Sequence, residues 1–172
     1  PTRRSSDLTS YFLVVIEENK NSIKGGWLYF VIAHVGFVLI MASFLLMTNG
    51  VGGSFSFSDF RTHDFGPAIS SVCFVLAFFG FGAKAGIIPL HSWLPQAPPE
   101  APSNVSALMS GGMIKIGILG ILKVGLDLLA GSGVQLWWGL MVLVFGSISS
   151  VLGVVYALHE HDIKRLLAYH SV

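Results

Sequence analysis

Two lysines lie inside long apolar stretches of this sequence, where a charged side chain is costly. Lys84 lies between Phe81 and Pro89, and Lys115 lies near the middle of a later apolar stretch. A lysine at the centre of a membrane-spanning helix raises the free energy of insertion by roughly 2.5–3.5 kcal/mol, and such residues usually mark a path for ions or protons. The chemistry that they suggest is the binding and release of protons.

Lys84 allows two interpretations. It lies about six residues, or roughly 9 Å, from the end of its predicted helix. The first interpretation is therefore a snorkelling lysine, whose long side chain reaches back to the membrane interface. Three neighbouring glycines and Pro89 favour the other, a locally unwound helix. Irregular backbone at membrane depth is tolerated only where protein or a water-filled cavity surrounds it. We therefore expect Lys84 to belong to an ion pathway in a broken span.

Lys115 is too deep for its side chain to reach water. It lies about twelve residues, or roughly 18 Å, from the ends of its predicted helix. A structural ion pair is the alternative, but the neighbouring predicted helices Pro67–Leu90 and Leu136–Leu158 contain no Asp or Glu. Burial lowers the pKa of an amine, and a second ammonium nearby lowers it further. Two lysines on adjacent antiparallel helices are therefore able to exchange a proton.

Two histidines complete the predicted proton pathway. His34 lies in an otherwise apolar stretch and is either a buried, hydrogen-bonded side chain or a side group of the relay. His91 follows Pro89 and either couples the relay to the cytoplasm or caps a helix. The predicted pathway residues are therefore Lys84, Lys115, His34 and His91, with no catalytic, cofactor-binding or metal-binding residue. Lys123 and Asp127, four residues apart, predict a local ion pair.

The elements that position these residues are predicted membrane-spanning helices. A bilayer core about 30 Å thick requires roughly 20 apolar residues per helix. Four stretches are long enough, and a partial span lies at either end, at Leu8–Ile16 and after Arg165. The fold class is therefore all-α, a polytopic transmembrane helix bundle with one span broken near Lys84–Pro89. The four full spans are predicted at Trp27–Thr48, Pro67–Leu90, Ser103–Leu126 and Leu136–Leu158, with Ser103 as a helix N-cap.

Small residues at four-residue spacing indicate that these spans pack as a bundle, because such residues let helix backbones approach closely in lipid. The rows are Ser103, Ala107 and Gly111, then Gly146 with Ser150, and Ser149 with Gly153.

Composition supports a membrane protein and excludes several other classes. Of 172 residues, 53% are hydrophobic and 11% are charged, whereas soluble domains carry about 25% charged residues. The net charge of +1 and the lack of Lys/Arg clusters give no reason to expect a nucleic-acid partner. The sequence has no nucleotide-binding loop, metal-spaced cluster or hydrolase elbow. Cys73, the single cysteine, is expected to be a small buried apolar side chain.

The loops predict an orientation. Three of them, at Glu17–Gly26, His91–Pro102 and His159–Arg165, lie on one side and carry more Lys and Arg than the other side. The positive-inside rule therefore places them in the cytoplasm, and the chain in the inner (cytoplasmic) membrane as a multi-pass protein. Residues 1–7 show no periodicity and are expected to be a non-native leader. Residues 8–172 are expected to be a fragment of one transmembrane domain.

From Gly80 to Val124 the sequence, GFGAKAGIIPLHSWLPQAPPEAPSNVSALMSGGMIKIGILGILKV, resembles the central region of the antiporter-like proton-translocating membrane subunits. These include subunits of respiratory complex I and of sodium/proton antiporter complexes. The cytoplasmic segment between two later spans of that family resembles Ala157–Val172, ALHEHDIKRLLAYHSV. The end of the family's fifth span resembles Leu8–Val15, LTSYFLVV. The predicted spans of this chain would then correspond to the family's spans from the fifth to the start of the tenth.

The resemblance assigns roles. It implies that Lys84 is the lysine of the broken seventh span and Lys115 the central lysine of the eighth. Lys164 and Arg165 match the basic segment between the ninth and tenth spans. The glutamate that pairs with the seventh-span lysine is expected upstream of Leu8. The resemblance implies that this chain holds no redox cofactor. It also implies that lipid surrounds the chain and that its partners are the membrane and peripheral subunits of a redox complex.

Four hypotheses for function follow. The sequence is most similar to the large membrane subunit of energy-conserving hydrogenases, of the formate hydrogenlyase and hydrogenase-4 type, which implies a proton-translocating, non-catalytic subunit of an oxidoreductase complex. The alternatives are the equivalent subunit of an NADH-quinone oxidoreductase, a cation/proton antiporter subunit and a membrane scaffold whose lysines are structural. The residues do not distinguish protons from sodium ions.

Overall fold

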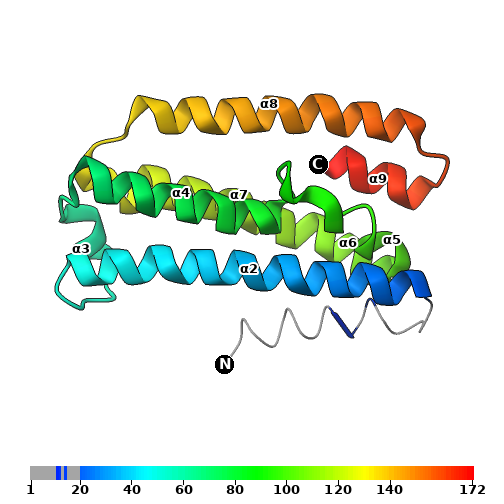
Figure 1. The fold of residues 1–172 in the computed structure, drawn as a ribbon, viewed down its shortest axis with the longest axis horizontal. Helices are drawn as coiled ribbons and strands as arrows, with labels where there is room; N and C mark the ends of the chain where they lie inside the picture. Colours follow the sequence, from blue (N-terminus) through cyan, green and yellow to red (C-terminus); the bar gives the residue numbers. More distant parts are fainter. Residues whose placement is uncertain (1–10, 13, 15–19) are drawn as a thin grey trace.

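The computed structural model describes residues 11, 12, 14 and 20–172 and shows long helices lying side by side (Figure 1). α8 lies along one side of the bundle, α2 along the other, and α4 and α7 lie between them. The described residues form no strand. The α-helices are α2 (Lys20–Gly50), α3 (Phe57–Thr62), α4 (Gly66–Ala85), α5 (Ala97–Glu100), α6 (Ser103–Leu108), α7 (Ile114–Leu122), α8 (Leu136–His159) and α9 (Ile163–Ser171). Short 3-10 turns are η1 (Leu90–Trp93) and η4 (Ala130–Ser132), and π-helical turns are η2 (Met109–Met113) and η3 (Lys123–Leu128).

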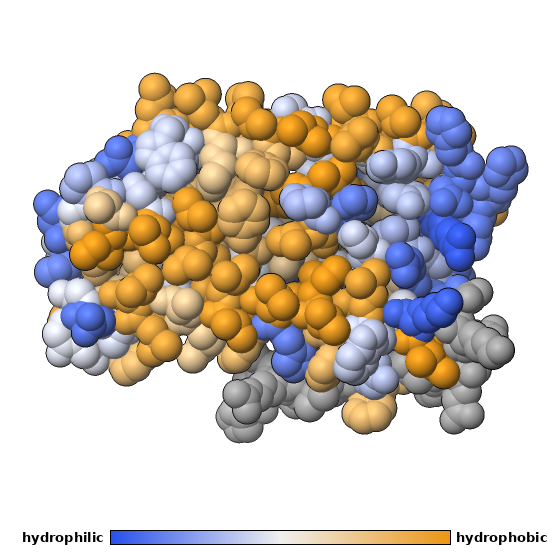
Figure 2. Space-filling view, viewed as in Figure 1, coloured by the Kyte–Doolittle hydropathy of each residue, from blue (hydrophilic) through white to orange (hydrophobic). Residues whose placement is uncertain are grey.

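Four helical segments are long and apolar enough to cross a membrane, which confirms the predicted all-α membrane bundle. They are Ser22–Gly50, Gly66–Trp93, Ser103–Leu128 and Leu136–His159. The third is one continuous rod in which η2 and η3 interrupt the α-helical hydrogen bonding. Apolar side chains cover the middle of the molecule, and hydrophilic ones gather towards its two ends (Figure 2). Such a surface matches a lipid environment.

Three local predictions were wrong. The segment at Glu17–Gly26 is not all loop, because α2 already begins at Lys20; lysine and its polar neighbours are compatible with a helix, so loss of apolar character does not end one. Ser103 is the first residue of α6 rather than its N-cap, since Pro102 holds that position. The proline-rich segment at His91–Pro102 still forms a 3-10 turn and α5.

The predictions for residues 1–7, and most of the partial span at Leu8–Ile16, lie outside the described residues. Of that span, Val14 is fully buried in a cluster with Tyr29 and Trp93. At the other end, α9 confirms that a new helix starts after the charged segment near His159.

Glycines set the closest contacts between α4 and its neighbours. A Cβ added at Gly80 would lie 2.9 Å from the carbonyl oxygen of Gly36 and 2.7 Å from Cγ1 of Ile40, both on α2. A Cβ at Gly117 of α7 would lie 2.8 Å from the backbone nitrogen of Ala85 on α4. Because the backbones themselves meet at these points, α4 is held on both sides with little room for movement.

This packing predicts the effect of one methyl group. Gly80→Ala should destabilise the bundle by about 1–3 kcal/mol, the usual effect of overpacking, because its neighbours include backbone atoms that move little. The measurement is the midpoint of thermal aggregation of the purified full-length protein. Gly146→Ala is the matched control, since a Cβ there meets no atom within 4 Å. Equal midpoints for the two variants would contradict this account of the α2–α4 contact.

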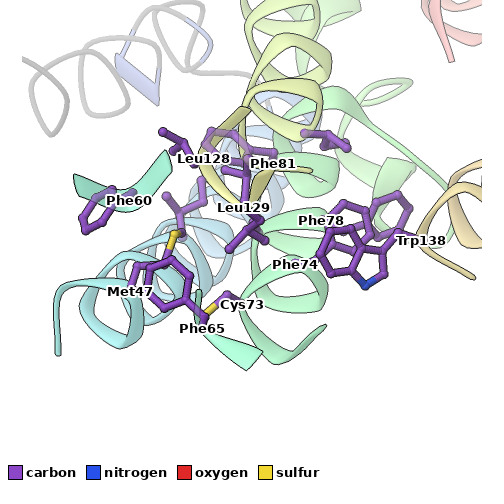
Figure 3. Packing of buried hydrophobic residues seen from close by; sticks show 14 residues of the cluster. Met47, Phe60, Phe65, Cys73, Phe74, Phe78, Phe81, Leu128, Leu129 and Trp138 are labelled. Carbon is purple, nitrogen blue, oxygen red and sulfur yellow. The ribbon is translucent and has the colours of Figure 1, made fainter. Parts of the chain in front are cut away.

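Aromatic side chains attach α8 to the rest of the bundle. The rings of Trp138 and Phe74 are stacked with centroids 4.7 Å apart, and Phe145 lies 5.5 Å from Phe78. Figure 3 shows Trp138 beside Phe74 and Phe78 in the apolar core that continues to Met47, Phe65 and Cys73. Cys73 is a fully buried free thiol, as expected. Its carbonyl accepts a hydrogen bond of 2.8 Å from the hydroxyl of Ser43, which links α2 to α4 inside the core.

Candidate functional site: two lysines at a helix crossing

The helix that carries Lys84, α4, is broken where the sequence predicted. α4 ends at Ala85, and Gly86 takes a left-handed conformation with φ of 74°, which glycine adopts without steric strain. The amides of Gly86 and Ile87 both donate to the carbonyl of Gly82. The chain then runs irregularly to η1 and α5. This confirms the expected break near Lys84–Pro89.

Side chains from two other elements satisfy the backbone groups that the break releases. The indole Nε1 of Trp93 donates to the carbonyl oxygen of Ala83 at 2.8 Å, and the amide of Ile88 donates to Oγ of Ser149 on α8 at 3.0 Å. Trp93 and Ser149 are both buried. Unpaired backbone groups are costly in an apolar medium, so these two hydrogen bonds stabilise a non-helical segment inside the bundle.

Lys84 lies in the last turn of α4, immediately before this break. Its side chain is half-buried and lines an apolar groove of about 590 Å³ between α2, α4 and α6–α7. The next residue, Ala85, is level with Gly117 of α7. Gly117 lies fourteen residues after Ser103, about 21 Å along the helix at 1.5 Å per residue. The base of Lys84 is therefore deeper than the roughly 9 Å inferred from sequence, because the helix ends inside the bundle.

Lys115 lies on the other side of the same crossing, two residues before Gly117. Its side chain is exposed and points away from the described helices rather than into their core, so it is not buried within this part of the chain. Among the residues that the structure describes, no ion pair joins Lys115 to a carboxylate. The structure thus brings the Lys84 and Lys115 positions to one level of the bundle, on antiparallel helices in direct backbone contact.

A π-helical turn directly precedes Lys115. η2 covers Met109–Met113, and α-helical bonding resumes at Ile114. Such turns are rare and frequently occur at functional sites, because the extra residue rotates all side chains that follow it. It therefore sets the direction in which Lys115 points. Gly111 and Gly112, inside the turn, have no atom within 4 Å of an added Cβ, so the surface beside Lys115 is open.

His34 is not buried, contrary to one of its two interpretations. It lies on the exposed face of α2, its Nδ1 donates to the carbonyl of Phe30 at 2.8 Å, and the two rings lie 4.0 Å apart. Both contacts stay within one turn of the same helix. The structure therefore gives His34 a local partner and does not bring it into the lysine crossing.

His91 lies on η1 and faces α8. Its ring is parallel to that of Tyr156, at 6.4 Å and 17°, and Tyr156 in turn lies 5.5 Å from Tyr169 of α9. Nδ1 of His91 is shielded from solvent and has no hydrogen-bond partner among the described residues. No hydrogen bond from the His91 side chain to a helix end is found among the described residues.

Charged residues gather at the two ends of the bundle. One end holds a pocket of about 320 Å³ whose lining includes Lys24, Glu100, Glu160 and Arg165. Residues of all three predicted cytoplasmic loops therefore meet at one end, as expected. Lys164 also lies there, and its Nζ donates to the carbonyl oxygens of Pro99 and Ala101 at 3.2 and 3.3 Å.

The opposite end contains the Lys123–Asp127 pair that the sequence predicted. The structure adds Arg61, whose Nε and Nη2 both lie 2.9 Å from the same carboxylate. This third member links α3 to η3. Sequence spacing does not reveal it, because Arg61 and Asp127 are 66 residues apart.

Other contributors were also missed by sequence reasoning. Trp93 hydrogen-bonds to a carbonyl in the last turn of α4, and Lys164 to carbonyls in and just after α5, and nothing in their spacing shows which carbonyls lie near. Ser149 carried a signal, since it belongs to a small-residue row, but that row predicts close packing rather than a hydrogen bond. Gly153 of that row packs as predicted, with its Cβ position 3.1 Å from the carbonyl oxygen of Tyr169. The described residues hold no group of three His, Cys, Asp or Glu side chains placed to bind a metal ion.

Comparison with known proteins gives a consistent result. Residues 5–172 match the transmembrane family described as NADH:quinone oxidoreductase/Mrp antiporter. The chain is 61% identical over 165 residues to hydrogenase-4 component B of Escherichia coli (strain K12), covering 96% of this chain and 24% of that protein. It is 40% identical over 150 residues to formate hydrogenlyase subunit 3 of the same strain, covering 87% of this chain and 24% of that protein.

A solved structure shows the same fold. The structure of the Mrp complex from Dietzia sp. DQ12-45-1b matches with a TM-score of 0.86 and 26% identity, covering 98% of this chain and 18% of the matched chain. The chain thus spans about a quarter of the length of the curated relatives named above.

Proposed function

The chain belongs to the NADH:quinone oxidoreductase/Mrp antiporter transmembrane family, and we propose that it is part of a proton-translocating membrane subunit of a hydrogenase complex of the formate hydrogenlyase type. In this proposal the redox chemistry takes place in partner subunits, and this chain moves protons through Lys84 and Lys115. The supporting similarity is 61% identity to hydrogenase-4 component B and 40% to formate hydrogenlyase subunit 3.

One observation carries the proposal. Lys84 and Lys115 lie on either side of the point where Gly117 of α7 meets Ala85 of α4, at mid-depth in the bundle. Charged groups at that depth are costly and usually functional. A proton can pass between two amines at one level without either group holding a permanent charge. His91, next to the break in α4, is proposed as a further pathway residue; His34, with its local partner, is the weakest member of the set.

The surface around Lys115 favours access from one side. On the side of Ser103, most exposed positions on the way to Lys115 are small or polar, including Ser103, Ala107 and Gly111, and Leu108 is the one large apolar side chain exposed among the described residues there. Beyond Lys115, the exposed positions are large and apolar, including Ile118, Leu119 and Leu122. Small and hydroxyl-bearing residues leave space for water, whereas branched apolar side chains exclude it. We therefore infer that Lys115 exchanges protons with the side on which α6 begins, which the loop charges indicate to be the cytoplasm.

A cation/proton antiporter subunit is the second candidate, because the Mrp complex shares the fold. The lower identity to that structure, 26% against 61% for hydrogenase-4 component B, favours the hydrogenase type. The experiment that tests the proposal is redox-driven proton uptake into inverted membrane vesicles that contain the full-length protein in its complex, with and without the two lysines. Uptake driven only by a sodium gradient would favour the antiporter.

The proposed orientation predicts which sites are labelled from each side. Cysteines placed at Lys24 and Arg165 in the full-length protein should react with a membrane-impermeant thiol reagent from the cytoplasmic side, because both residues line the same end pocket. A cysteine at Arg61 should react only from the opposite side. Labelling of all three positions from one side would contradict the four-span topology, and the reverse pattern would invert the orientation.

A further inference from the structure

A cavity of about 330 Å³, lined by hydroxyl and imidazole groups as well as by apolar side chains, lies between α6 and α9, on the side of the bundle where α6 begins. Serine hydroxyls of α6 and η2 form one wall, from Ser103 and Ser106 to Ser110. His170 and Ser171 of α9 form the other. Figure 1 shows α9 running back from the bundle end towards its middle, beneath α8. An apolar bundle rarely gathers hydroxyl and imidazole groups around one space, because each needs a hydrogen-bond partner there.

The inner end of this cavity has a defined hydrogen-bond pattern. The hydroxyls of Ser110 and Ser171 lie 3.1 Å apart, and Ser171 also donates to the carbonyl oxygen of Leu167 at 2.9 Å. A serine hydroxyl has one proton to donate, so Ser110 is the donor in the serine pair. The lone pairs of Ser110 remain available to accept a hydrogen bond from water in the cavity.

The inner end of the cavity lies near Lys115 in position along the rod. Ser110 lies five residues before Lys115, about 7.5 Å along the rod at 1.5 Å per residue. The intervening Gly111 and Gly112 present no side chain, and an added Cβ at either would meet no atom within 4 Å. η2 contains both glycines and lengthens this turn. The surface over these two glycines, between the serine pair and the lysine, is therefore open in the described part of the chain.

At the outer end of the cavity, Lys164 links α9 to the segment around α5. Its ammonium donates to the carbonyls of Pro99 and Ala101, which fixes the start of α9 against the segment that leads into α6. Lys164 is the only charged side chain among the described residues that line the cavity. Glu100, Glu160 and Arg165 line the neighbouring end pocket instead. His170, six residues after Lys164, lies about 9 Å further along α9.

We propose that this cavity is the entry site for protons bound for Lys115, and that His170 is the residue that exchanges them. The proposal rests on the proposed function. The neutral imidazole accepts a proton from the aqueous phase on one nitrogen and releases one from the other to a cavity water. That water passes a proton to the neutral amine of Lys115, which becomes ammonium. Histidine suits this role because it gains and loses a proton near neutral pH.

The structure separates His170 from the other histidines of this segment. By sequence alone, His159, His161 and His170 are all surface residues at the end of a span. His159 is held by its own helix, since its Nδ1 donates to the carbonyl of Val155 at 2.8 Å. Of the three, only His170 lines the cavity.

The first arm of the test measures water access and does not depend on transport. Ser110→Cys is made in the full-length protein, in its complex, and treated with a charged, membrane-impermeant methanethiosulfonate from the cytoplasmic side. The variant should be modified, whereas Gly146→Cys, on the apolar α8, should not. An unmodified Ser110→Cys in an assembled complex would overturn the proposal.

The second arm tests His170 in vesicles whose cytoplasmic face is outward. His170→Ala should slow redox-driven proton uptake roughly tenfold, less than the ~10² or more typical of a lost acid–base group because water still enters the cavity. An external imidazole that carries a sulfonate, and so cannot cross the bilayer, should restore the rate. His159→Ala should keep the wild-type rate. A His170→Ala complex with the wild-type rate, or one that the imidazole does not rescue, would overturn the proposal. Failure of the proposed function would differ, because the wild type itself would take up no protons.

Discussion

Replacement of Lys115 by either arginine or methionine should abolish proton transfer while the complex still assembles. A relay lysine must bind and release a proton, whereas arginine stays protonated and methionine carries no ionisable group. The Lys115 side chain is exposed on the described helices and pairs with no carboxylate among them. Methionine has a similar length and should therefore leave the fold intact. We expect proton uptake to fall by about 10²-fold or more in both variants.

The two variants separate a relay from a structural charge. If a buried carboxylate from another span pairs with Lys115, methionine should destabilise the protein by roughly 3–5 kcal/mol, the effect of leaving one partner unpaired, and arginine should function. The measurements are proton uptake into vesicles and the amount of assembled complex on a native gel. An active Lys115→Arg together with an unassembled Lys115→Met would contradict the relay and favour the scaffold hypothesis.

Lys84→Ala should strongly reduce coupled proton translocation, by about 10²-fold or more, and leave assembly intact. Lys84 directly precedes a helix end that other groups stabilise, namely Gly86, Trp93 and Ser149. Because none of these hydrogen bonds involves the lysine side chain, its loss should not unfold the break. The measurement is again vesicle proton uptake, normalised to assembled complex.

Lys123→Ala is the matched control for Lys84. Lys123 lies on the same rod as Lys115, but its ammonium pairs with Asp127 near a span end, and Arg61 also binds that carboxylate. Exposed pairs of this kind stabilise a protein by less than about 1 kcal/mol. Lys123→Ala should therefore keep both assembly and uptake. Unchanged uptake by an assembled Lys84→Ala complex would instead make Lys84 a snorkelling residue.

The spans could be predicted from sequence because apolar length decides them. Each predicted full span lies within one of the four segments that are long and apolar enough to cross a membrane, and the break after Lys84 followed from its glycines and Pro89. The boundary at Lys20 could not be predicted, because a helix that projects from the membrane continues through polar residues. The π-helical turn before Lys115 was missed for a similar reason: no residue type is specific to it.

The candidate site was predictable in its residues but not in its geometry. A lysine in an apolar stretch is visible in one dimension, so Lys84 and Lys115 were found. That they share one level depends on Gly117 meeting Ala85, a contact between segments 32 residues apart in the chain. The cavity beside His170 depends on α9 folding back against α6, which no local pattern encodes. Helix packing therefore decides which polar residues face one another.

The most direct test of the central claim is the number of protons taken up per electron transferred, measured on the same vesicles for wild type and Lys115→Met. Both samples contain the full-length protein in its complex, with assembly confirmed. We expect the wild type to take up more protons than the redox chemistry consumes, and Lys115→Met to lose this excess or to stop turning over. An assembled Lys115→Met complex with the wild-type number of protons per electron would contradict the claim.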